Sequence, residues 1–385
     1  MNNTKVAVIH NLLTPYIIPF FKELVKQKEY QFKFFLTSEN KLNREQQKEI
    51  DNKFDYLILP KFSINFPDQD EFSYFINPTF LYEIIKYKPD VIIAAGWDTF
   101  SYLLSFLYAK IFHKKFILWS GSTKYENNWR RIISRLLVRS LIKYSDALIS
   151  YGTRAKKYLI QLRAKREKIF IAYNTVDIDF FIKAISLLRK AEPKKQEREI
   201  KKKKKTIILY IGQLIERKGI KDLIKAIEIL KSKIANIVLL LVGDGIMKSE
   251  ILNYLKKNQL EDTVRVMGNI KYNSLPEIYH LANIFVLPSR EEVWGLVINE
   301  AMACGLPVIT SNKTGASDDL VKQGENGFIF PARNYHILAQ YLKTVIENPI
   351  LARKMGENSS RLIKSFNNRE RARIFYTAIN YVLKN

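Results

Sequence analysis

Two glutamates, Glu292 and Glu300, lie eight positions apart in the stretch EEVWGLVINEAMACGLPVI, residues 291–309. The apolar residues around them predict a buried helix that begins at Gly295 and ends near Gly305. Burying a carboxylate is costly unless hydrogen-bond donors compensate it. We therefore expect these two side chains to hold a polar ligand, and the hydroxyl groups of a ribose or another sugar would supply the donors.

An anion site is predicted beside the two glutamates. The first N–H groups of the expected helix have no intrahelical acceptor and suit a diphosphate, namely those of Gly295, Leu296 and Val297. Upstream, in YIGQLIERKGIKDL, a strand ends at Gly212 and Lys218 precedes a helix. A lysine at a helix N-terminus favours anion binding. The alternative is an ordinary strand–turn–helix with an exposed lysine.

Together these segments resemble the retaining family 4 glycosyltransferases of the GT-B fold. The motifs are Glu-x7-Glu with AMACGLPVI, the upstream GQLIERKG, YNTVDIDFF at 173–181 and GASDDLVKQGENGFIF at 315–330. The resemblance implies that Glu300 holds the ribose of a nucleotide-sugar, and that Glu292 and Lys218 are catalytic. Glu292 would hold the transferred sugar, and Lys218 would neutralise the leaving diphosphate. The sugar phosphate would be surrounded by the amides of Trp294, Gly295, Leu296 and Val297.

One position departs from the pattern of the resembled family. Many relatives have an arginine where this chain has Gln213, and a neutral amide cannot neutralise a phosphate. Arg217, beside Lys218, is the substitute that we expect, and Gly212 completes the predicted donor-binding residues. Trp294 either stacks on the ligand or fills the loop. The alternative for Glu292 and Glu300 is a salt-bridged structural pair, which is disfavoured because their apolar neighbours offer no cation.

The elements that position these residues follow the pattern of parallel α/β domains, with short β-branched runs between helical stretches. The expected strands are 5–10, 31–37, 91–96, 115–120, 147–150, 169–173, 206–212, 236–243, 264–269, 284–289, 307–311 and 327–330. The implied fold is GT-B, two Rossmann-like doubly wound domains that face each other across a cleft. We expect an acceptor-binding domain at 1–188, a basic linker at 189–205, a nucleotide-sugar-binding domain at 206–360, and a C-terminal helix at 361–385 that packs back on the first domain.

Acceptor-binding residues are expected just after strands of the first half, because ligands bind at the carboxyl ends of such strands. The candidates are His10, Trp97, Asp98, Ser120 and Ser122. The alternative for His10 is a strand-end histidine bonded to the backbone.

The formal net charge of +25 predicts an anionic partner. In the helical stretch 129–146 a basic stripe recurs every four residues, formed by Arg131, Arg135, Arg139 and Lys143. A second face carries Ile132, Ile133, Leu136, Leu137 and Leu141. The stretch is interpreted either as a face that meets anionic lipid or as a helix packed on the sheet with a solvated basic face.

Composition limits the remaining possibilities. A single cysteine, Cys304, excludes disulfides and is interpreted as a packing residue. The N-terminus reads as a strand, and the apolar stretch 100–112 is too short to span a membrane, so we expect a cytoplasmic protein, peripheral on the inner face of the membrane. The Asp-x-Asp matches at Asp68/Asp70 and Asp177/Asp179 are interpreted as chance, and neither metal nor another cofactor is expected.

The sequence therefore predicts a retaining, metal-independent glycosyltransferase. It would move a sugar from a nucleotide-sugar to a lipid-linked saccharide in surface polysaccharide or lipopolysaccharide biosynthesis. One alternative is a nucleotide-sugar 2-epimerase of the same fold, which needs acid/base residues around the sugar that the sequence does not display. Another is a basic nucleic-acid-binding protein, which would explain the charge but not the two glutamates.

Overall fold

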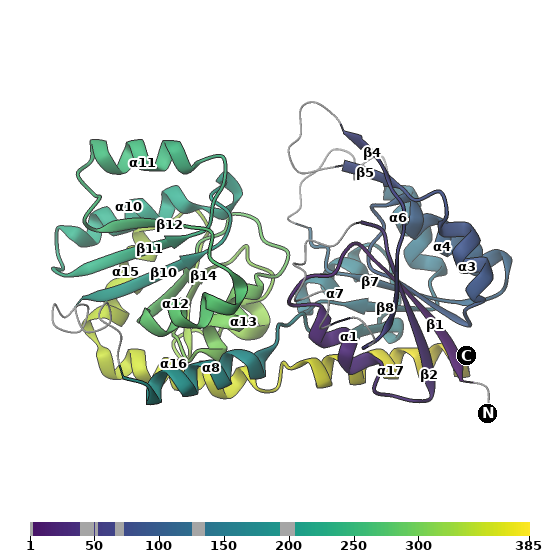
Figure 1. The fold of residues 1–385 in the computed structure, drawn as a ribbon. Coiled ribbons are helices and arrows are strands. Elements are labelled where there is room, and N and C mark those ends of the chain that lie inside the picture. Colours follow the sequence, from purple (N-terminus) through teal and green to yellow (C-terminus); the bar gives the residue numbers. More distant parts are fainter. Residues whose placement is uncertain (1–2, 39–49, 51–52, 66–72, 125–134, 193–204) are drawn as a thin grey trace. The chain divides into compact units, whose positions relative to one another are not determined.

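A computed structural model describes residues 3–38, 50, 53–65, 73–124, 135–192 and 205–385 (Figure 1). The chain forms two compact units. Unit 1 comprises Met1–Val176 together with Asn368–Asn385, and unit 2 comprises Asp177–Asn367. Each unit is built around its own parallel sheet.

The sheet of unit 1 has seven parallel strands in the order β3-β2-β1-β6-β7-β8-β9. Its strands are β1 (Thr4–His10), β2 (Tyr30–Leu36), β3 (Asp55–Ile58), β6 (Val91–Ala94), β7 (Lys115–Ser120), β8 (Ala147–Ser150) and β9 (Ile169–Ile171). Runs of apolar residues in the central strands, 6–9, 91–94 and 116–119, are fully buried because helices cover both faces of the sheet. A separate antiparallel pair is formed by β4 (Phe62–Asn65) and β5 (Ser73–Ile76).

Two hydrophobic clusters attach helices to opposite faces of this sheet. One face packs against α1 (Ile18–Leu24) and α17 (Asn368–Lys384), through side chains such as Phe20 and Phe375. The other is covered by α3 (Phe80–Tyr87), α4 (Phe100–Ile111), α6 (Arg135–Tyr144) and α7 (Thr153–Gln161). A short 3-10 turn, η1 (Arg166–Lys168), precedes β9.

The sheet of unit 2 has six parallel strands in the order β12-β11-β10-β13-β14-β15. They are β10 (Thr206–Ile211), β11 (Ile237–Val242), β12 (Val264–Gly268), β13 (Ile284–Leu287), β14 (Val308–Ser311) and β15 (Gly327–Phe330). The order reverses between β10 and β13, which are neighbours. In doubly wound sheets this switch point, at the carboxyl ends of the strands, is where ligands bind.

The helices of unit 2 pack on both faces of its sheet. They are α8 (Ile178–Lys190), α10 (Ile220–Lys231), α11 (Lys248–Lys257), α12 (Leu275–Leu281), α13 (Leu296–Ala303), α14 (Ser317–Leu320), α15 (Tyr335–Glu347) and α16 (Pro349–Ile363). Two 3-10 turns, η2 (Glu216–Lys218) and η3 (Tyr272–Ser274), follow the carboxyl ends of β10 and β12.

The boundary between the units differs from the sequence expectation. Unit 2 begins at Asp177, before the expected limit at residue 188, because α8 packs against α12 and α13 of unit 2. At the other end α16 stays with unit 2, and the chain returns to unit 1 as α17, which contacts α1, β7 and β8. Residues 193–204 of the expected linker lie outside the described residues.

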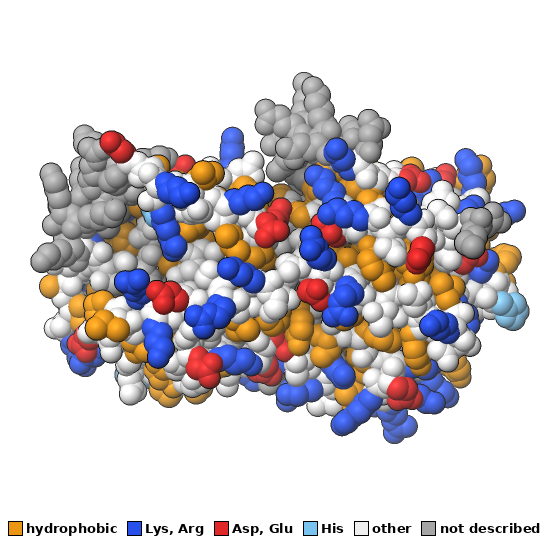
Figure 2. All heavy atoms as spheres, turned by 90° about the horizontal axis from the view of Figure 1, so that it is seen from below, with side chains coloured by type: hydrophobic (Ala, Val, Ile, Leu, Met, Phe, Trp, Pro, Cys, Tyr) orange, Lys and Arg blue, Asp and Glu red, His pale blue; other side chains and the backbone are white. Residues whose placement is uncertain are grey.

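All twelve expected strands are present within a few residues of their expected limits. The three short strands β3, β4 and β5 were not expected. The basic excess of the chain is spread out on the face shown in Figure 2, where acidic and apolar side chains lie between the lysines and arginines of its described part. No single basic strip crosses that part of the face.

Candidate active site

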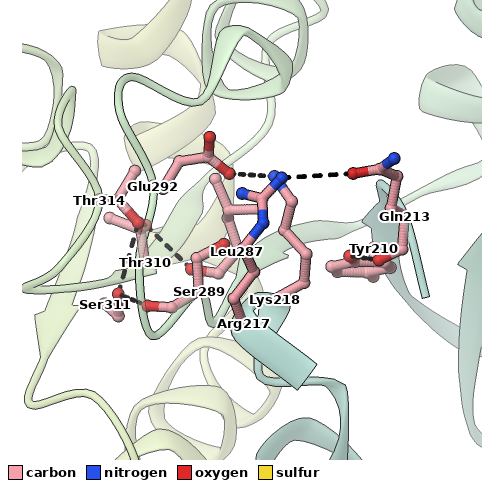
Figure 3. Close-up of polar contacts among 10 residues, drawn as sticks. All are labelled: Tyr210, Gln213, Arg217, Lys218, Leu287, Ser289, Glu292, Thr310, Ser311 and Thr314. Carbon is pink, nitrogen blue, oxygen red and sulfur yellow. Dashed lines mark hydrogen bonds and ion pairs between the residues drawn. The ribbon is translucent and has the colours of Figure 1, made fainter. Parts of the chain in front are cut away.

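Lys218 and Glu292 meet at the switch point of the unit 2 sheet. Lys218 ends the loop after β10, and Glu292 lies in the loop after β13. The Lys218 ammonium forms an ion pair with the Glu292 carboxylate, and each side chain is 13% exposed (Figure 3). The expectation that no cation lies near the two glutamates is therefore wrong for Glu292. Its cation comes from a loop 74 positions away in the sequence.

Arg290, in the loop after β13, is hydrogen-bonded to residues that follow β10. Its Nε and Nη2 donate to the two carboxylate oxygens of Asp222, both at 2.9 Å, and its Nη1 contacts Glu216. The backbone N–H of Arg290 donates to the carbonyl of Arg217 at 2.8 Å. A bidentate arginine–carboxylate pair fixes orientation as well as distance. Arg290 therefore positions Lys218, and sequence reasoning missed it, although an acid in the first helical turn after Lys218 was a signal.

Gly219 is required where these loops approach each other. Its φ is +71°, in the left-handed region, and a Cβ there would lie 2.2 Å from the carbonyl oxygen of Pro288. A larger residue would push the β13 loop away from Lys218. The glycine after Lys218 thus serves the close packing of two loops in addition to starting α10.

Arg217 and Gln213 lie beside the ion pair. The Arg217 guanidinium donates to the side-chain oxygen of Gln213 at 3.4 Å, and the Tyr210 hydroxyl donates to the Gln213 carbonyl at 2.8 Å (Figure 3). Burial raises the pKa of Tyr210, so it stays a neutral donor. Gly212 follows β10 directly and donates its N–H to Val242. The structure thus brings a cation next to Gln213, the position at which the departure from the family pattern was noted.

Glu300 lies in the interior, 4% exposed, on α13. Its carboxylate accepts a hydrogen bond of 2.7 Å from the hydroxyl of Tyr279, and burial raises the pKa of Glu300 to about 7. Among the described residues it forms no ion pair. Tyr279, on α12, is fully buried and was not predicted, because it lies 21 positions away.

The amides for which the sequence predicts an anion site lie at the start of α13. Gly295 has a φ of +95°, and the amides of Leu296 and Val297 precede Ile298, whose N–H donates to the Gly295 carbonyl at 2.9 Å. Trp294 is buried, and its Nε1–H donates to Asn299 at 3.0 Å. Of the two alternatives for this side chain, the structure shows the one that fills the loop.

The loop that carries Glu292 is held by the segment after β14. The Gly315 N–H donates to the Glu292 carbonyl at 3.0 Å, and the Ala316 N–H donates to the Trp294 carbonyl at 2.9 Å. Below them the Thr310 hydroxyl donates to the Leu287 carbonyl at 3.0 Å and contacts Thr314 (Figure 3). The GASDD motif therefore supports the glutamate loop through its backbone.

The acceptor candidates lie at strand ends of unit 1. His10 ends β1, and its Nδ1–H donates to the Leu12 carbonyl at 3.1 Å. Burial lowers the pKa of His10 to about 4, so the ring is neutral. His10 is therefore bonded to the backbone through Nδ1, as one of the two alternatives for this residue stated. Trp97 packs partly into the core and Asp98 is exposed, whereas Ser120 is buried and accepts from the Ser122 N–H at 3.2 Å.

Arg371, which sequence reasoning missed, lies beneath these strand ends. It comes from α17 and is 2% exposed, with its guanidinium carbon 4.2 Å from the ring centre of Phe20 and 5.0 Å from that of Trp119. None of its three side-chain nitrogens has an acceptor among the described residues. Burial lowers the pKa of Arg371 to about 10. The rings of Phe20 and Trp119 partly compensate the buried charge by cation–π contact.

The helix with the predicted basic stripe is oriented differently from the expectation. Val138, Leu141 and Ile142 are buried, whereas Leu136 is 76% and Leu137 47% exposed. The expected apolar face containing Leu136 and Leu137 is therefore wrong. Of the stripe, Lys143 is exposed and Arg139 partly buried, Arg135 begins α6 with an undescribed side chain, and Arg131 lies outside the described residues.

Of the two Asp-x-Asp segments, the structure describes the one at Asp177/Asp179. Asp177 caps α8 by accepting from the Phe180 N–H at 3.0 Å, while Asp68 and Asp70 lie outside the described residues. Within the described ranges, no group of three or more His, Cys, Asp or Glu side chains is placed to hold a metal ion. No described helix is long and apolar enough to cross a membrane.

Comparisons with known proteins fit this geometry. The family model described as "Glycosyl transferases group 1" matches residues 176–362, and "Glycosyltransferase Family 4" matches residues 20–180. The capsular polysaccharide biosynthesis glycosyltransferase CapM of Staphylococcus aureus is 34% identical over 162 residues, 41% of this chain and 41% of that protein. N-acetyl-alpha-D-glucosaminyl L-malate synthase of Bacillus anthracis is 27% identical over 58% of this chain and 56% of its own length. The matches thus span less than two thirds of these curated relatives.

Two solved structures share the fold over nearly the whole chain. Anabaena Alr3699/HepE in complex with UDP has a TM-score of 0.76 at 18% identity, covering 98% of this chain and 100% of that one. Sucrose-phosphate synthase of Thermosynechococcus elongatus has a TM-score of 0.73 at 19% identity, covering 99% and 100%. At this level of identity the likeness concerns the fold.

Proposed function

Because the chain belongs to the group 1 glycosyltransferases and has the GT-B fold, we propose that it transfers a sugar from a nucleotide-sugar to an acceptor. The observations that carry the proposal are the ion pair of Lys218 and Glu292 at the switch point of unit 2 and the buried carboxylate of Glu300 on α13, the helix that follows the Glu292 loop. All three lie within residues 176–362, the part that the group 1 family model matches. UDP in the complex of Anabaena Alr3699/HepE supports a nucleotide as the leaving part of the donor.

In the proposed donor complex the two charges of the ion pair take separate partners. The Lys218 ammonium would contact the diphosphate, and the Glu292 carboxylate would accept hydroxyl hydrogens of the transferred sugar. Arg217, held beside Gln213, would supply the second cation. The α13 amides of Leu296 and Val297 would complete the phosphate site.

The proposed reaction retains the configuration at the anomeric carbon. The bond between that carbon and the phosphate oxygen breaks, and the acceptor hydroxyl oxygen forms the new bond on the same face. The acceptor proton passes to the leaving phosphate. Negative charge grows on the diphosphate as its bond breaks, so Lys218 and Arg217 stabilise the transition state more than the ground state.

Glu300 would select the ribose. An ionised carboxylate can accept hydrogen bonds from both ribose hydroxyls. The hydrogen bond from the Tyr279 hydroxyl would fix the orientation of the Glu300 carboxylate. Because the pKa of Glu300 is about 7 in the free protein, donor binding must stabilise its ionised form. The bound hydroxyl groups provide that stabilisation.

A thermal-shift experiment without added metal tests the donor site. UDP, GDP and ADP sugars are compared on wild type, Glu300→Gln and the matched surface control Glu261→Gln. A nucleotide-sugar at 100 times its dissociation constant should stabilise wild type and control by about 2.7 kcal/mol. The shift should be lost in Glu300→Gln. Equal shifts in all three proteins, or no shift with any nucleotide-sugar, would refute the donor site.

We further propose that the acceptor is a lipid-linked saccharide of surface polysaccharide synthesis, met at an anionic membrane. The name of the CapM relative refers to capsular polysaccharide biosynthesis, which supports the polysaccharide part of this proposal. The outward sides of α3, α4 and α6 expose apolar side chains, including Leu81, Tyr82, Ile85, Phe100, Leu107, Ile111, Leu136, Leu137 and Tyr144. Lys143 lies beside Tyr144 on α6, so apolar contact and attraction to acidic headgroups are combined there.

Vesicle co-sedimentation tests the membrane contact. Wild type should bind vesicles containing phosphatidylglycerol more strongly than neutral phosphatidylcholine vesicles. The double variant Leu136→Ser/Leu137→Ser should bind them less, and the control Leu252→Ser, an exposed leucine of unit 2, should not. Binding that is equal for both vesicle types, or unchanged in the double variant, would contradict this part of the proposal.

The same assays separate the alternatives. A 2-epimerase would convert the donor sugar without an acceptor, whereas a transferase releases nucleotide only as an acceptor is glycosylated. Salt-sensitive binding of random DNA without any response to nucleotide-sugars would favour a nucleic-acid-binding protein. The dispersed charges on the face in Figure 2 do not favour that alternative.

A further inference from the structure

A cavity of about 380 Å³ lies in unit 2 at the amino ends of its strands, the opposite sheet edge from the candidate active site. Thr206 and Ile284 begin β10 and β13, and Pro307 directly precedes β14. The volume is at the lower end of the range typical of small-molecule sites. Much of the wall is apolar, formed by Ile284, Leu306, Pro307, Val345, Ile346, Pro349 and Ala352.

The charged groups of this cavity are arginines. Arg189, at the end of α8, and Arg353, on α16, both line it. Among the described residues no aspartate or glutamate lines the cavity. Its other polar side chains are Thr206, Tyr279, His280 and Asn283. Arg353 pairs with Glu357 at 3.0 Å, whereas Arg189 has no ion-pair partner among the described residues. The cavity therefore attracts negative charge.

Arg189 is placed at the cavity wall and not only near it. Its Nη2 lies 3.3 Å from the position that a Cβ on Gly305 would occupy. Gly305 and its neighbour Cys304 are both part of the lining. A guanidinium at this point can donate two parallel hydrogen bonds to a planar or tetrahedral anionic group in the cavity.

We propose that this cavity binds a small organic anion with an apolar body. The anionic group contacts Arg189, and the apolar part packs against the surrounding aliphatic side chains. This site does not depend on the proposed transferase activity. It shares one side chain with the candidate active site, because Tyr279 lines the cavity while its hydroxyl donates to Glu300.

Cys304 provides a reporter for occupancy, because it is the single cysteine of the chain and lines the cavity. The rate of its modification by the neutral reagent N-ethylmaleimide is measured with 1-naphthalenesulfonate or 1-naphthalenemethanol present. The two probes share the apolar body and differ in charge. The variants are Arg189→Gln and the matched control Lys190→Gln, which removes a neighbouring positive charge outside the lining.

The sulfonate should slow modification saturably, by about fivefold when its concentration is four times the dissociation constant. The alcohol should protect far less at the same concentration. Arg189→Gln should raise the half-protecting concentration of the sulfonate about tenfold, the loss of one charge-assisted contact. Lys190→Gln should leave it unchanged.

The proposal is overturned if both probes protect equally, if neither protects, or if the two variants behave alike. If N-ethylmaleimide does not modify the folded wild type, the thermal unfolding midpoint is measured instead. The two probes are then compared on wild type, and the sulfonate is compared on wild type and the two variants. In that measurement the sulfonate must stabilise wild type and Lys190→Gln equally, and Arg189→Gln clearly less at the same concentration. Because no nucleotide-sugar is present, failure here leaves the donor-site experiment unaffected.

Discussion

The Lys218 ammonium contacts the Glu292 carboxylate across two loops that belong to different strands of the unit 2 sheet. Each charge compensates the other in the structure, and both are proposed to contact the donor. The pair therefore holds two largely desolvated charges close together. Their mutual attraction offsets part of the free energy lost when each charge is removed from water.

Removing one member of this pair should destabilise unit 2. Lys218→Met leaves the Glu292 carboxylate partly buried without its cation, and we expect a loss of about 1–3 kcal/mol in the free energy of unfolding. The double variant Lys218→Met/Glu292→Gln should be more stable than Lys218→Met alone. Denaturant titrations of the three proteins give this comparison, and purely additive losses would show that the pair has no coupling energy.

The stability of unit 2 should depend on Glu300 between pH 4.5 and 7. Burial raises the pKa of this carboxyl from 4.5 to about 7, so in this window the folded state binds more protons than the unfolded state. The free energy of unfolding should consequently fall as the pH rises, by at most about 3 kcal/mol over the window. The pH profile of Glu300→Gln should lack this component, and superimposable profiles would contradict the assignment.

Donor affinity should change in the opposite direction. The hydroxyls of a ribose bind the ionised carboxylate. Below pH 7 the apparent dissociation constant of the nucleotide should therefore rise roughly tenfold for each unit by which the pH is lowered. Calorimetric titrations of UDP between pH 5.5 and 8.5 measure this slope. A nucleotide fragment without ribose hydroxyls serves as the control and should show no such slope, and an equal slope for both would remove Glu300 from ribose binding.

Arg290 should act on the donor only through the loops that it joins. Arg290→Lys keeps the charge but loses the bidentate contact with Asp222, so nucleotide affinity should fall about tenfold. Asp222→Asn should have a similar effect, and the double variant should lose little more than either single variant. Independent, additive losses in affinity would show that the two side chains do not act as one unit.

The buried Arg371 guanidinium lies over the rings of Phe20 and Trp119 and has no hydrogen-bond acceptor among the described residues. Arg371→Met keeps the length and apolar packing of the side chain, so unit 1 should be equally stable or more stable by about 1–2 kcal/mol. Thermal unfolding of the two proteins is the measurement. Strong destabilisation by Met, restored by Lys, would mean that the positive charge itself is needed at this position.

The strands and the donor-site loops were predictable because their signals are local. Apolar β-branched runs identify the strands. Lys218 directly precedes Gly219, and Glu292 and Glu300 lie on either side of Gly295, the glycine before α13. Tyr279, Arg290 and Arg371 were missed because each acts on a partner that is brought near by the fold alone. No spacing in the sequence shows that the Tyr279 hydroxyl meets Glu300.

The orientation of α6 shows another limit of sequence patterns. Leucines at 136 and 137 suit an inward face as well as an outward one, and the periodicity alone does not state which face meets the sheet. The structure buries Leu141 as expected, but it buries Val138 and Ile142 in place of the two leucines. The choice is made by the neighbouring helices and strands, whose packing lies outside the helix's own sequence.

The return of α17 to unit 1 determines the order in which the chain is able to fold during synthesis. Unit 2 is one continuous segment, Asp177–Asn367, and all of it has been translated before the last helix appears. Unit 1 lacks Phe375 and Ile379, which fill one side of its sheet, until Asn368–Asn385 has left the ribosome. The hydrophobic core of unit 1 is thus completed after that of unit 2. A chain truncated before Asn368 would contain all of unit 2 but would leave one face of the unit 1 sheet partly uncovered.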